Sequence, residues 1–176
     1  PLAEGESGPG RLCEPDAIVA ELAANIGHVP TPAANGLLQG LKVVVSAGPT
    51  YEDLDPVRYL GNRSSGKMGF AIASVAAERG AEVTLVAGPV HLATPAGVHR
   101  IDVRSAAQMF DAVMGALPCD AYIGAAAVAD FTPLSIASNK LKKQPGQDTL
   151  LLELVKTRDI LAEVAAHAAR PRLVVG

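Results

Sequence analysis

The stretch VVVSAGPTYEDLDPVRYLGNRSSGKMGF, residues 43–70, decides the fold. It begins within Leu41–Ala47, an apolar run typical of a buried strand, which leads into the small-residue turn SAGPT. After a polar crossing, the segment Gly61–Gly69 opens a helix with small residues that leave backbone N–H groups uncovered. These groups and the helix dipole attract phosphate. We therefore interpret the stretch as a cradle for the phosphates of a nucleotide.

Strand-like and helix-like segments alternate from Leu41 to the end of the sequence. We expect strands over 43–47, 82–87, 98–103, 120–128, 149–155 and 173–175, and helices over 14–26, 67–79, after 105 and after 157. Ser105 and Gln108 form a capping box, and Thr157 is expected to cap the last helix. Strands separated by helices predict an α/β fold, namely a doubly wound, Rossmann-like, mostly parallel sheet with helices on both faces. Because a strand runs to Gly176, we expect the sheet to be C-terminally incomplete.

The composition favours one main domain with one substantial core, since 49% of the 176 residues are hydrophobic. A net charge of −3 and an aromatic content of 3% give no support to nucleic acid or a membrane surface as a partner. Cys13 and Cys119 lie far apart, and no secretory signal is visible, so we expect a cytoplasmic protein. The four histidines have no metal-ligand spacing.

The glycine-rich segment has several interpretations. Residues 61–67 match the Walker A pattern G-x-x-x-x-G-K, but Met68 stands where Ser or Thr would bind magnesium. The segment also lies well downstream of the first strand, and no G-x-G-x-x-G follows that strand, which disfavours an ATPase loop and a dinucleotide enzyme. A structural glycine-rich loop and a distinct phosphate-binding loop remain.

Polar residues near the expected strand ends are candidates for chemistry. Asn62 could cap the helix, or its amide could donate to a developing acyl or phosphoryl oxyanion. Asp130 follows a strand of small residues, where it could turn the chain or hold Mg²⁺ or a ribose hydroxyl. Lys140 lies in the basic run NKLKK, which is either solvated or neutralises a triphosphate. Asp55 and Arg58 are expected to form a surface pair.

Together these motifs resemble the phosphopantothenoylcysteine synthetase domain of the bacterial bifunctional coenzyme A biosynthesis flavoprotein. The motifs that carry the resemblance are SAGPT (46–50), DPVRYLGNRSSGKMGFAIA (55–73), TLVAGP (84–89), AAVADF (126–131), KLKKQ (140–144) and KTRDIL (156–161). The resemblance covers residues 41–176, which we expect to be a synthetase domain truncated at its C-terminus. Residues 1–40 look like the tail of the preceding decarboxylase domain and a linker. FMN is implied only for that decarboxylase domain, whose flavin-binding body this sequence lacks.

The resemblance implies a ligase that uses CTP and Mg²⁺. In the implied reaction the carboxylate of 4′-phosphopantothenate attacks the α-phosphate of CTP, and pyrophosphate leaves. The amine of L-cysteine then displaces CMP from the acyl cytidylate and forms an amide. Synthetases of this family are homodimers in which the neighbouring protomer completes the site.

The resemblance also assigns roles to residues that match the family motifs. Asn62 acts on the acyl cytidylate, Lys140 contacts the triphosphate, and Asp130 is near Mg²⁺. The residues implied to lie along the phosphates are Gly48, Ser64, Gly66 and Gly69; those lining the pocket are Gly124, Ala125 and Ala126; and those on the cytidine side are Arg158, Asp159, Ile160 and Leu161. The arginine at position 158 departs from the proline expected there.

Two other functions remain open. A nicotinamide- or flavin-dependent oxidoreductase on a Rossmann-like sheet would need an acid after the second strand, where the sequence has Ala87-Gly88-Pro89. A non-catalytic nucleotide-binding or dimerising fragment would be stabilised by CTP without releasing pyrophosphate.

Overall fold

The computed structural model describes residues 15–25, 36–142, 145–146 and 148–176. Its elements are, in chain order, α1 (Pro15–Asn25), β1 (Lys42–Pro49), β2 (Tyr51–Asp53), β3 (Tyr59–Gly61), α2 (Lys67–Glu78), β4 (Glu82–Ala87), β5 (Val98–Asp102), α3 (Ala106–Gly115), β6 (Ala121–Ala127), β7 (Phe131–Pro133), β8 (Leu154–Lys156), α4 (Ile160–Ala166) and β9 (Leu173–Val175). Residues 1–14 and most of the expected linker lie outside the described residues.

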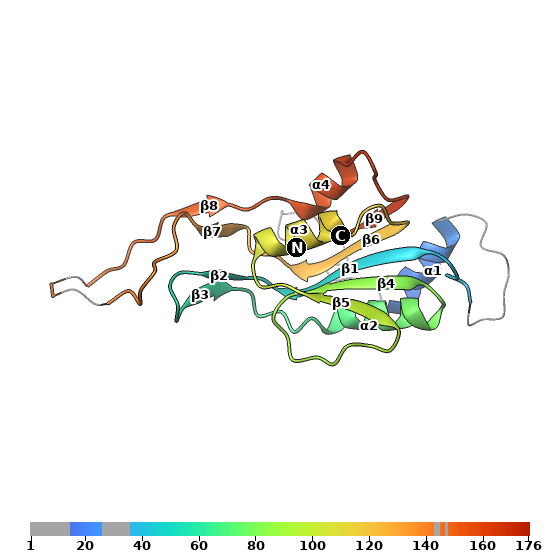
Figure 1. Ribbon diagram of the computed structural model, residues 1–176, viewed down its shortest axis with the longest axis horizontal. Helices are drawn as coiled ribbons and strands as arrows, with labels where there is room; N and C mark the ends of the chain where they lie inside the picture. The colour runs from blue at the N-terminus through green and yellow to red at the C-terminus, as the bar shows by residue number, and fades with distance from the viewer. Residues whose placement is uncertain (1–14, 26–35, 143–144, 147) are drawn as a thin grey trace, which may run out of the picture.

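Five parallel strands form the central sheet in the order β5-β4-β1-β6-β9. The central strand β1 pairs with β4 on one side and β6 on the other, so that Val43 is opposite both Val83 and Ala121. Numbered by their place in the chain, these strands run 3-2-1-4-5, which is the doubly wound order. The expected α/β fold is therefore confirmed (Figure 1).

Helices cover both faces of the sheet, because alternate residues of each strand point to opposite sides. Val43 and Val45 pack with Ile72 of α2 in one buried cluster. Val44 packs with Met109 of α3 in the cluster on the other face, which also includes residues of α4. The apolar run of β1 is thus buried on both faces, as expected of a central parallel strand.

Helix α1 forms where the sequence predicts a helix over residues 14–26. Its Ile18 and Leu22 are buried in the same cluster as Val43 of β1, and it contacts α2. Helix α1, which precedes residue 41 in the chain, therefore packs against the core of the sheet.

Two segments differ from the sequence expectation. The polar crossing after β1 contains an antiparallel hairpin, β2–β3. The strand expected over residues 149–155 is reduced to β8, which pairs with β7 over residues 154–156. Thr157 does not cap the following helix; Asp159 does, because its Oδ1 accepts a hydrogen bond from the amide of Ala162 at 2.9 Å.

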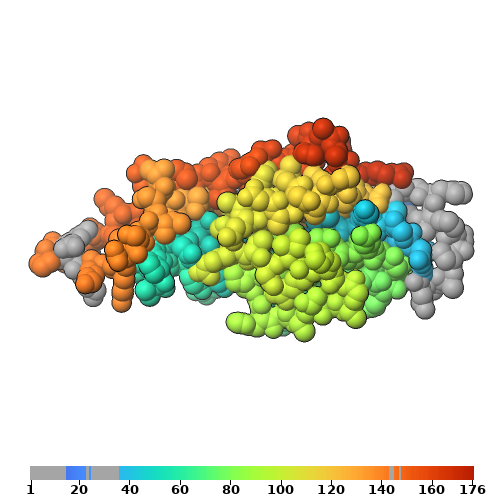
Figure 2. Space-filling view, viewed as in Figure 1, coloured from blue at the N-terminus to red at the C-terminus, as the bar shows by residue number. Residues whose placement is uncertain are grey.

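The molecule is elongated, because β2–β3 and β7–β8 extend from one end of the sheet (Figure 1). The segment that joins β7 to β8 projects furthest, and the space-filling view shows it as an orange arm beside the compact body (Figure 2). In the described part of the chain, no helix is long and apolar enough to cross a membrane.

Candidate functional site

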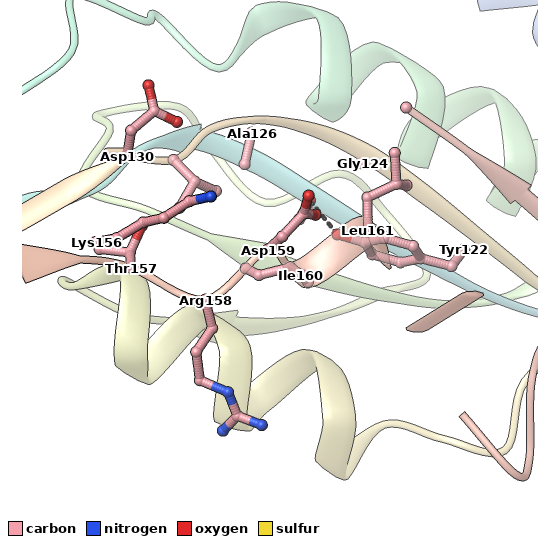
Figure 3. Close-up of a pocket in the computed structure, with 13 residues that line it drawn as sticks. Tyr122, Gly124, Ala126, Asp130, Lys156, Thr157, Arg158, Asp159, Ile160 and Leu161 are labelled. Carbon is pink, nitrogen blue, oxygen red and sulfur yellow. Dashed lines mark hydrogen bonds between the residues drawn. The ribbon is translucent and has the colours of Figure 1, made fainter. Parts of the chain in front are cut away.

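A cavity of about 430 Å³ lies beside the carboxyl end of β6 (Figure 3). The chain connections reverse direction between β1 and β6, and ligands of doubly wound sheets bind at such a switch point. The cavity is lined by Ser46, Tyr122, Gly124, Ala126, Val128, Asp130, Lys156, Thr157, Arg158, Asp159, Ile160, Leu161 and Gly176. Seven of these residues are among those that the family resemblance assigned to the site.

Small side chains on β6 create the space for this cavity. Gly124 and Ala126 line it, whereas Ala125 packs against the cluster on the opposite face of the sheet, as the two-residue period of a strand requires. A Cβ atom added to Gly124 would lie 3.4 Å from the hydroxyl of Tyr122 and 3.6 Å from a methyl of Leu161. Side-chain volume at position 124 would therefore reduce the cavity.

A pair of hydroxyl groups lies against the inner part of the cavity. The Oγ of Ser46 and the hydroxyl of Tyr122 are 3.0 Å apart and hydrogen-bonded. Burial raises the pKa of Tyr122, so the phenol stays protonated at neutral pH. The sequence did not identify this pair, although the strand period places each residue two positions before a glycine already assigned to the site, Gly48 or Gly124.

The segment 156–161 forms the opposite wall, and hydrogen bonds hold it against the end of β6. The hydroxyl of Thr157 donates to the carbonyl of Ala129 at 2.6 Å, and its amide donates to the carbonyl of Asp130 at 2.9 Å. The hydroxyl that was expected to cap α4 is thus used to fix this wall. Lys156 and Thr157 belong to the motif KTRDIL but were not assigned to the site.

Arg158 is among the residues that line the cavity, but its guanidinium is directed away from it. Figure 3 shows the guanidinium directed toward α3, where it lies 3.4 Å from the ring centroid of Phe110. It also lies 3.7 Å from a carboxylate oxygen of Glu163. The departure from the expected proline is therefore accommodated by a cation–π contact outside the cavity.

Asp130 and Lys156 bring opposite charges to one end of the cavity (Figure 3). Asp130 is exposed. Among the described residues, no group of three or more His, Cys, Asp or Glu side chains could hold a metal ion. Magnesium at this position would therefore resemble those sites in which one carboxylate, substrate phosphates and water share the ion.

The glycine-rich loop packs closely on the end of β1, on the side of the sheet that carries α2. Gly48 and Gly66 have φ values of +81° and +73°, which favour glycine. A Cβ atom on Gly66 would lie 3.3 Å from the Cα of Gly48, and one on Gly69 would lie 2.4 Å from the Cβ of Ala47. The Oγ of Ser64 accepts a hydrogen bond from the amide of Gly66 at 3.3 Å.

Gly66 is the N-cap of α2, and no side chain caps this helix. Its first amides therefore lack the side-chain acceptor that most helices use. The loop has the geometry of an anion site, but Gly48, Ser64, Gly66 and Gly69 do not line the 430 Å³ cavity.

Asn62 connects the glycine-rich loop to the end of β6. Its Nδ2 donates to the carbonyl of Ala127 at 3.0 Å and is 3.4 Å from the carbonyl of Val128. Its Oδ1 accepts no hydrogen bond from any described residue. The amide nitrogen that was expected to donate to an oxyanion is thus directed at backbone carbonyls, whereas no donor among the described residues reaches the oxygen.

Lys140 lies apart from the cavity. It is exposed on the segment between β7 and β8, and this segment is tied to the turn between β2 and β3 through Asp55 and Arg58. The expected surface pair is only half exposed: the Asp55 side chain has no exposed area, and that of Arg58 keeps 42%. In this single chain Lys140 is therefore not brought together with the residues of the cavity.

Comparison with known proteins shows the family to which this chain belongs. Residues 38–176 match the family model described as the DNA/pantothenate metabolism flavoprotein C-terminal domain. The chain belongs to this family. The expected resemblance is confirmed, and the match begins three residues before the expected start of the domain.

Two curated bacterial proteins are similar to this chain over nearly its whole length. The chain is 50% identical over 173 residues to the coenzyme A biosynthesis bifunctional protein CoaBC of Vibrio cholerae. It is 48% identical over 174 residues to CoaBC of Escherichia coli K12. Both alignments cover 98% of this chain but only 42% and 41% of those proteins, so the chain spans less than half of their length.

Solved structures share the fold. The C-terminal domain of a CoaBC protein is 41% identical, with a TM-score of 0.66, over 77% of this chain and 63% of that chain. A Cab2 mutant in complex with phosphopantothenate-cysteine is 15% identical, with a TM-score of 0.61, over 91% of this chain and 68% of that chain. At that identity, the second likeness shows the fold alone.

Proposed function

We propose that this chain is a ligase domain that joins 4′-phosphopantothenate to L-cysteine in coenzyme A biosynthesis. The carboxylate of 4′-phosphopantothenate attacks the α-phosphate of CTP, pyrophosphate leaves, and the amine of cysteine displaces CMP from the acyl cytidylate. The observation that carries the proposal is the cavity at the switch point, lined by the residues that the family motifs associate with the nucleotide. The name of the CoaBC relatives supports the pathway.

The reaction brings anions together, so its main requirement is to offset their repulsion. The N-terminus of α2 has no side-chain cap, so its first amides could donate to phosphate oxygens. Asp130 offers one carboxylate for Mg²⁺ shared with those oxygens. Magnesium would supply a Lewis acid that neutralises charge on the leaving pyrophosphate. Lys140 would add a positive charge near the triphosphate.

Asn62 would act in the second step. Because its Nδ2 is directed at the carbonyls of Ala127 and Val128, the free Oδ1 is the atom available to a substrate. A carbonyl oxygen accepts hydrogen bonds, so it suits the N–H groups of the attacking amine. We therefore assign two roles to Asn62. Its Nδ2 holds the glycine-rich loop against the end of β6, where the acyl cytidylate would bind, and its Oδ1 orients the attacking amine.

The chain would act as a homodimer. Large apolar side chains are exposed on β3, on β7 and on the segment that joins β7 to β8. They include Tyr59, Phe131, Ile136 and Leu151. Several large apolar side chains exposed on neighbouring elements are typical of an interaction site. A second copy of the chain is the partner that the family resemblance implies, and it would bring its own Lys140 toward the first copy's cavity.

Calorimetric titration with CTP, ATP and NAD⁺ in the presence of Mg²⁺ tests the nucleotide. We expect selective binding of CTP.

A variant that fills the cavity tests where CTP binds. In Ala126→Leu the added side chain fills the cavity, and we expect CTP affinity to fall by about tenfold or more. Ala24→Leu, the same change at an exposed position of α1, should leave affinity unchanged. Preference for NAD⁺, or equal CTP affinity in both variants, would contradict the proposal.

The role of Asn62 is tested by Asn62→Asp in the longer protein that contains this domain. We expect the acyl cytidylate to accumulate, because the second step stalls while pyrophosphate is still released. Separate assays of pyrophosphate and of the amide product distinguish the two steps. Amide formation at the normal rate would rule out this role.

A further inference from the structure

Asp55, in the turn between β2 and β3, is a buried carboxylate that the proposed mechanism does not use. Its side chain has no exposed area, and buried carboxylates are rare unless they are paired and hydrogen-bonded. Arg58 lies next to it, with 2.6 Å between the Nη2 of Arg58 and the Oδ2 of Asp55. A buried carboxylate that is paired with a half-exposed arginine in this way requires a structural or functional explanation.

Five contacts from N–H groups satisfy this carboxylate. Its Oδ1 accepts hydrogen bonds from the backbone amides of Val57 and Arg58, both at 2.8 Å. Its Oδ2 accepts from the Nε and Nη2 of Arg58, at 3.1 Å and 2.6 Å. The fifth donor is the backbone amide of Leu141, at 3.0 Å, from a segment 86 residues later in the chain.

The same pair also holds the carbonyl of Leu141, which accepts a hydrogen bond from the Nη2 of Arg58 at 2.7 Å. Both backbone groups of Leu141 are therefore fixed. The amide of Ala137 donates to the carbonyl of Leu54 at 3.0 Å, which adds a second attachment four residues earlier. We call this arrangement of Asp55, Arg58 and Leu141 the clamp.

The residue next to the clamp is Lys140, whose side chain is exposed and makes no ion pair with a described residue. A lysine ammonium is a point charge on a flexible stem, so the position of its backbone decides the region that the charge can reach. We propose that Asp55 is a positioning residue that fixes Lys140 through the backbone of Leu141. This inference rests on the proposed function for the role of Lys140, but not for the clamp itself.

Asp55→Asn tests the clamp with a side chain of nearly the same shape. Both carboxylate oxygens accept from at least two N–H groups, so either orientation of an asparagine amide directs its NH₂ at other donors. Asp102→Asn is the matched control, because Asp102 forms an ion pair with Arg100 but is 70% exposed and lies on β5.

Hydrogen exchange and limited trypsin digestion of the whole chain measure the effect. In Asp55→Asn we expect the Leu141 amide to exchange, and the bond after Lys140 to be cleaved, about tenfold faster or more, as expected from losing hydrogen bonds to a charged group. The protection of the backbone amides of β1, β4 and β6 against hydrogen exchange should not change. Unchanged Leu141 protection, or equal acceleration in Asp102→Asn, would overturn the clamp.

A double-mutant cycle then tests whether Asp55 acts through Lys140. We expect Asp55→Asn and Lys140→Ala to weaken CTP binding by similar factors, and the double variant to be no weaker than either one. Additive losses would overturn the positioning role. If the unmodified chain does not bind CTP at all, the proposed function fails, whereas the exchange measurement still decides the clamp.

Discussion

At the scale of single residues, Asp55 shows how tertiary contacts change the chemistry of a side chain. Burial by itself would raise the pKa of Asp55, but the amide of Leu141 and the guanidinium of Arg58 outweigh it and hold the pKa well below the usual range. A carboxylate with a lowered pKa stabilises the folded state above its unfolded pKa. That stabilisation is lost as the pH falls toward the folded pKa.

The free-energy difference of unfolding between the wild-type chain and Asp55→Asn should therefore depend on pH in a defined direction. We expect the wild type to be more stable, by a constant margin, between pH 7 and pH 5. The margin should shrink below about pH 4, the ordinary pKa of an unfolded aspartate. Urea denaturation at a series of pH values measures it. A margin that stays constant down to pH 3 would contradict the lowered pKa.

Gly69 shows the competition between helix propensity and packing. Alanine is favoured over glycine within a helix by up to about 1 kcal/mol. A Cβ at position 69, however, would lie 2.4 Å from the Cβ of Ala47, and such overpacking costs about 1–3 kcal/mol. We therefore expect Gly69→Ala to lower the free energy of unfolding, by up to about 2 kcal/mol in urea denaturation.

Gly115→Ala is the control for this substitution. Gly115 is the last residue of α3, and an added Cβ would meet no atom within 4 Å. Propensity alone should act there, so we expect a small gain in stability. Equal effects of the two substitutions would mean that the close contact of Gly69 with β1 does not limit this position.

At the scale of elements, helices and strands form where short stretches of the sequence predict them. The capping box of α3 is present, with the Oγ of Ser105 accepting from the amide of Gln108 at 3.2 Å, as predicted. Strand β4 has its predicted bounds, and β9 does as well. A cap or a buried apolar run is determined by neighbouring residues, so the sequence alone is enough to place it.

Removing the cap of α3 tests this local contribution. We expect Ser105→Ala to lower the free energy of unfolding by about 1 kcal/mol, because the amide of Gln108 loses its acceptor. Ser74→Ala, within α2, removes only a hydrogen bond to the exposed side chain of Glu78 and should cost less. Urea denaturation of both variants makes the comparison. A larger loss in Ser74→Ala would contradict the importance of the cap.

The strand expected over residues 149–155 forms only over residues 154–156, for a reason that the local sequence does not show. Its apolar residues favour a strand, but a strand needs a partner, and only residues 154–156 have β7 opposite them. Residues 149–153 are not in a strand, and Leu151 is 93% exposed. Whether a partner exists is decided by the path of the whole chain.

At the scale of the whole molecule, the segment between β7 and β8 projects from the body of the protein (Figure 2). Its exposed apolar residues lead us to expect that two copies of the chain associate through it. If a second copy covers its apolar residues, a charge placed there should weaken the dimer. We expect Leu151→Glu to shift the chain toward monomer in analytical ultracentrifugation, because burying an unpaired charge is costly. His91→Glu, at an exposed position after β4, is the control. A monomeric wild-type chain at micromolar concentration would contradict the proposed dimer.

The sequence by itself determined the alternation of strands and helices, the parallel fold and the glycine-rich turn, because each depends on residues close together in the chain. It also indicated the small residues of β6 that leave room for the cavity. Only the tertiary structure decided that Ser46 and Tyr122 share that cavity. It also decided that the amide nitrogen of Asn62 is held by carbonyls of β6 and the residue after it, and that the carboxylate of Asp55 accepts a hydrogen bond from the amide of Leu141. The physical reason is distance along the chain: these contacts join residues 65 to 86 positions apart, and no local pattern encodes which of them meet.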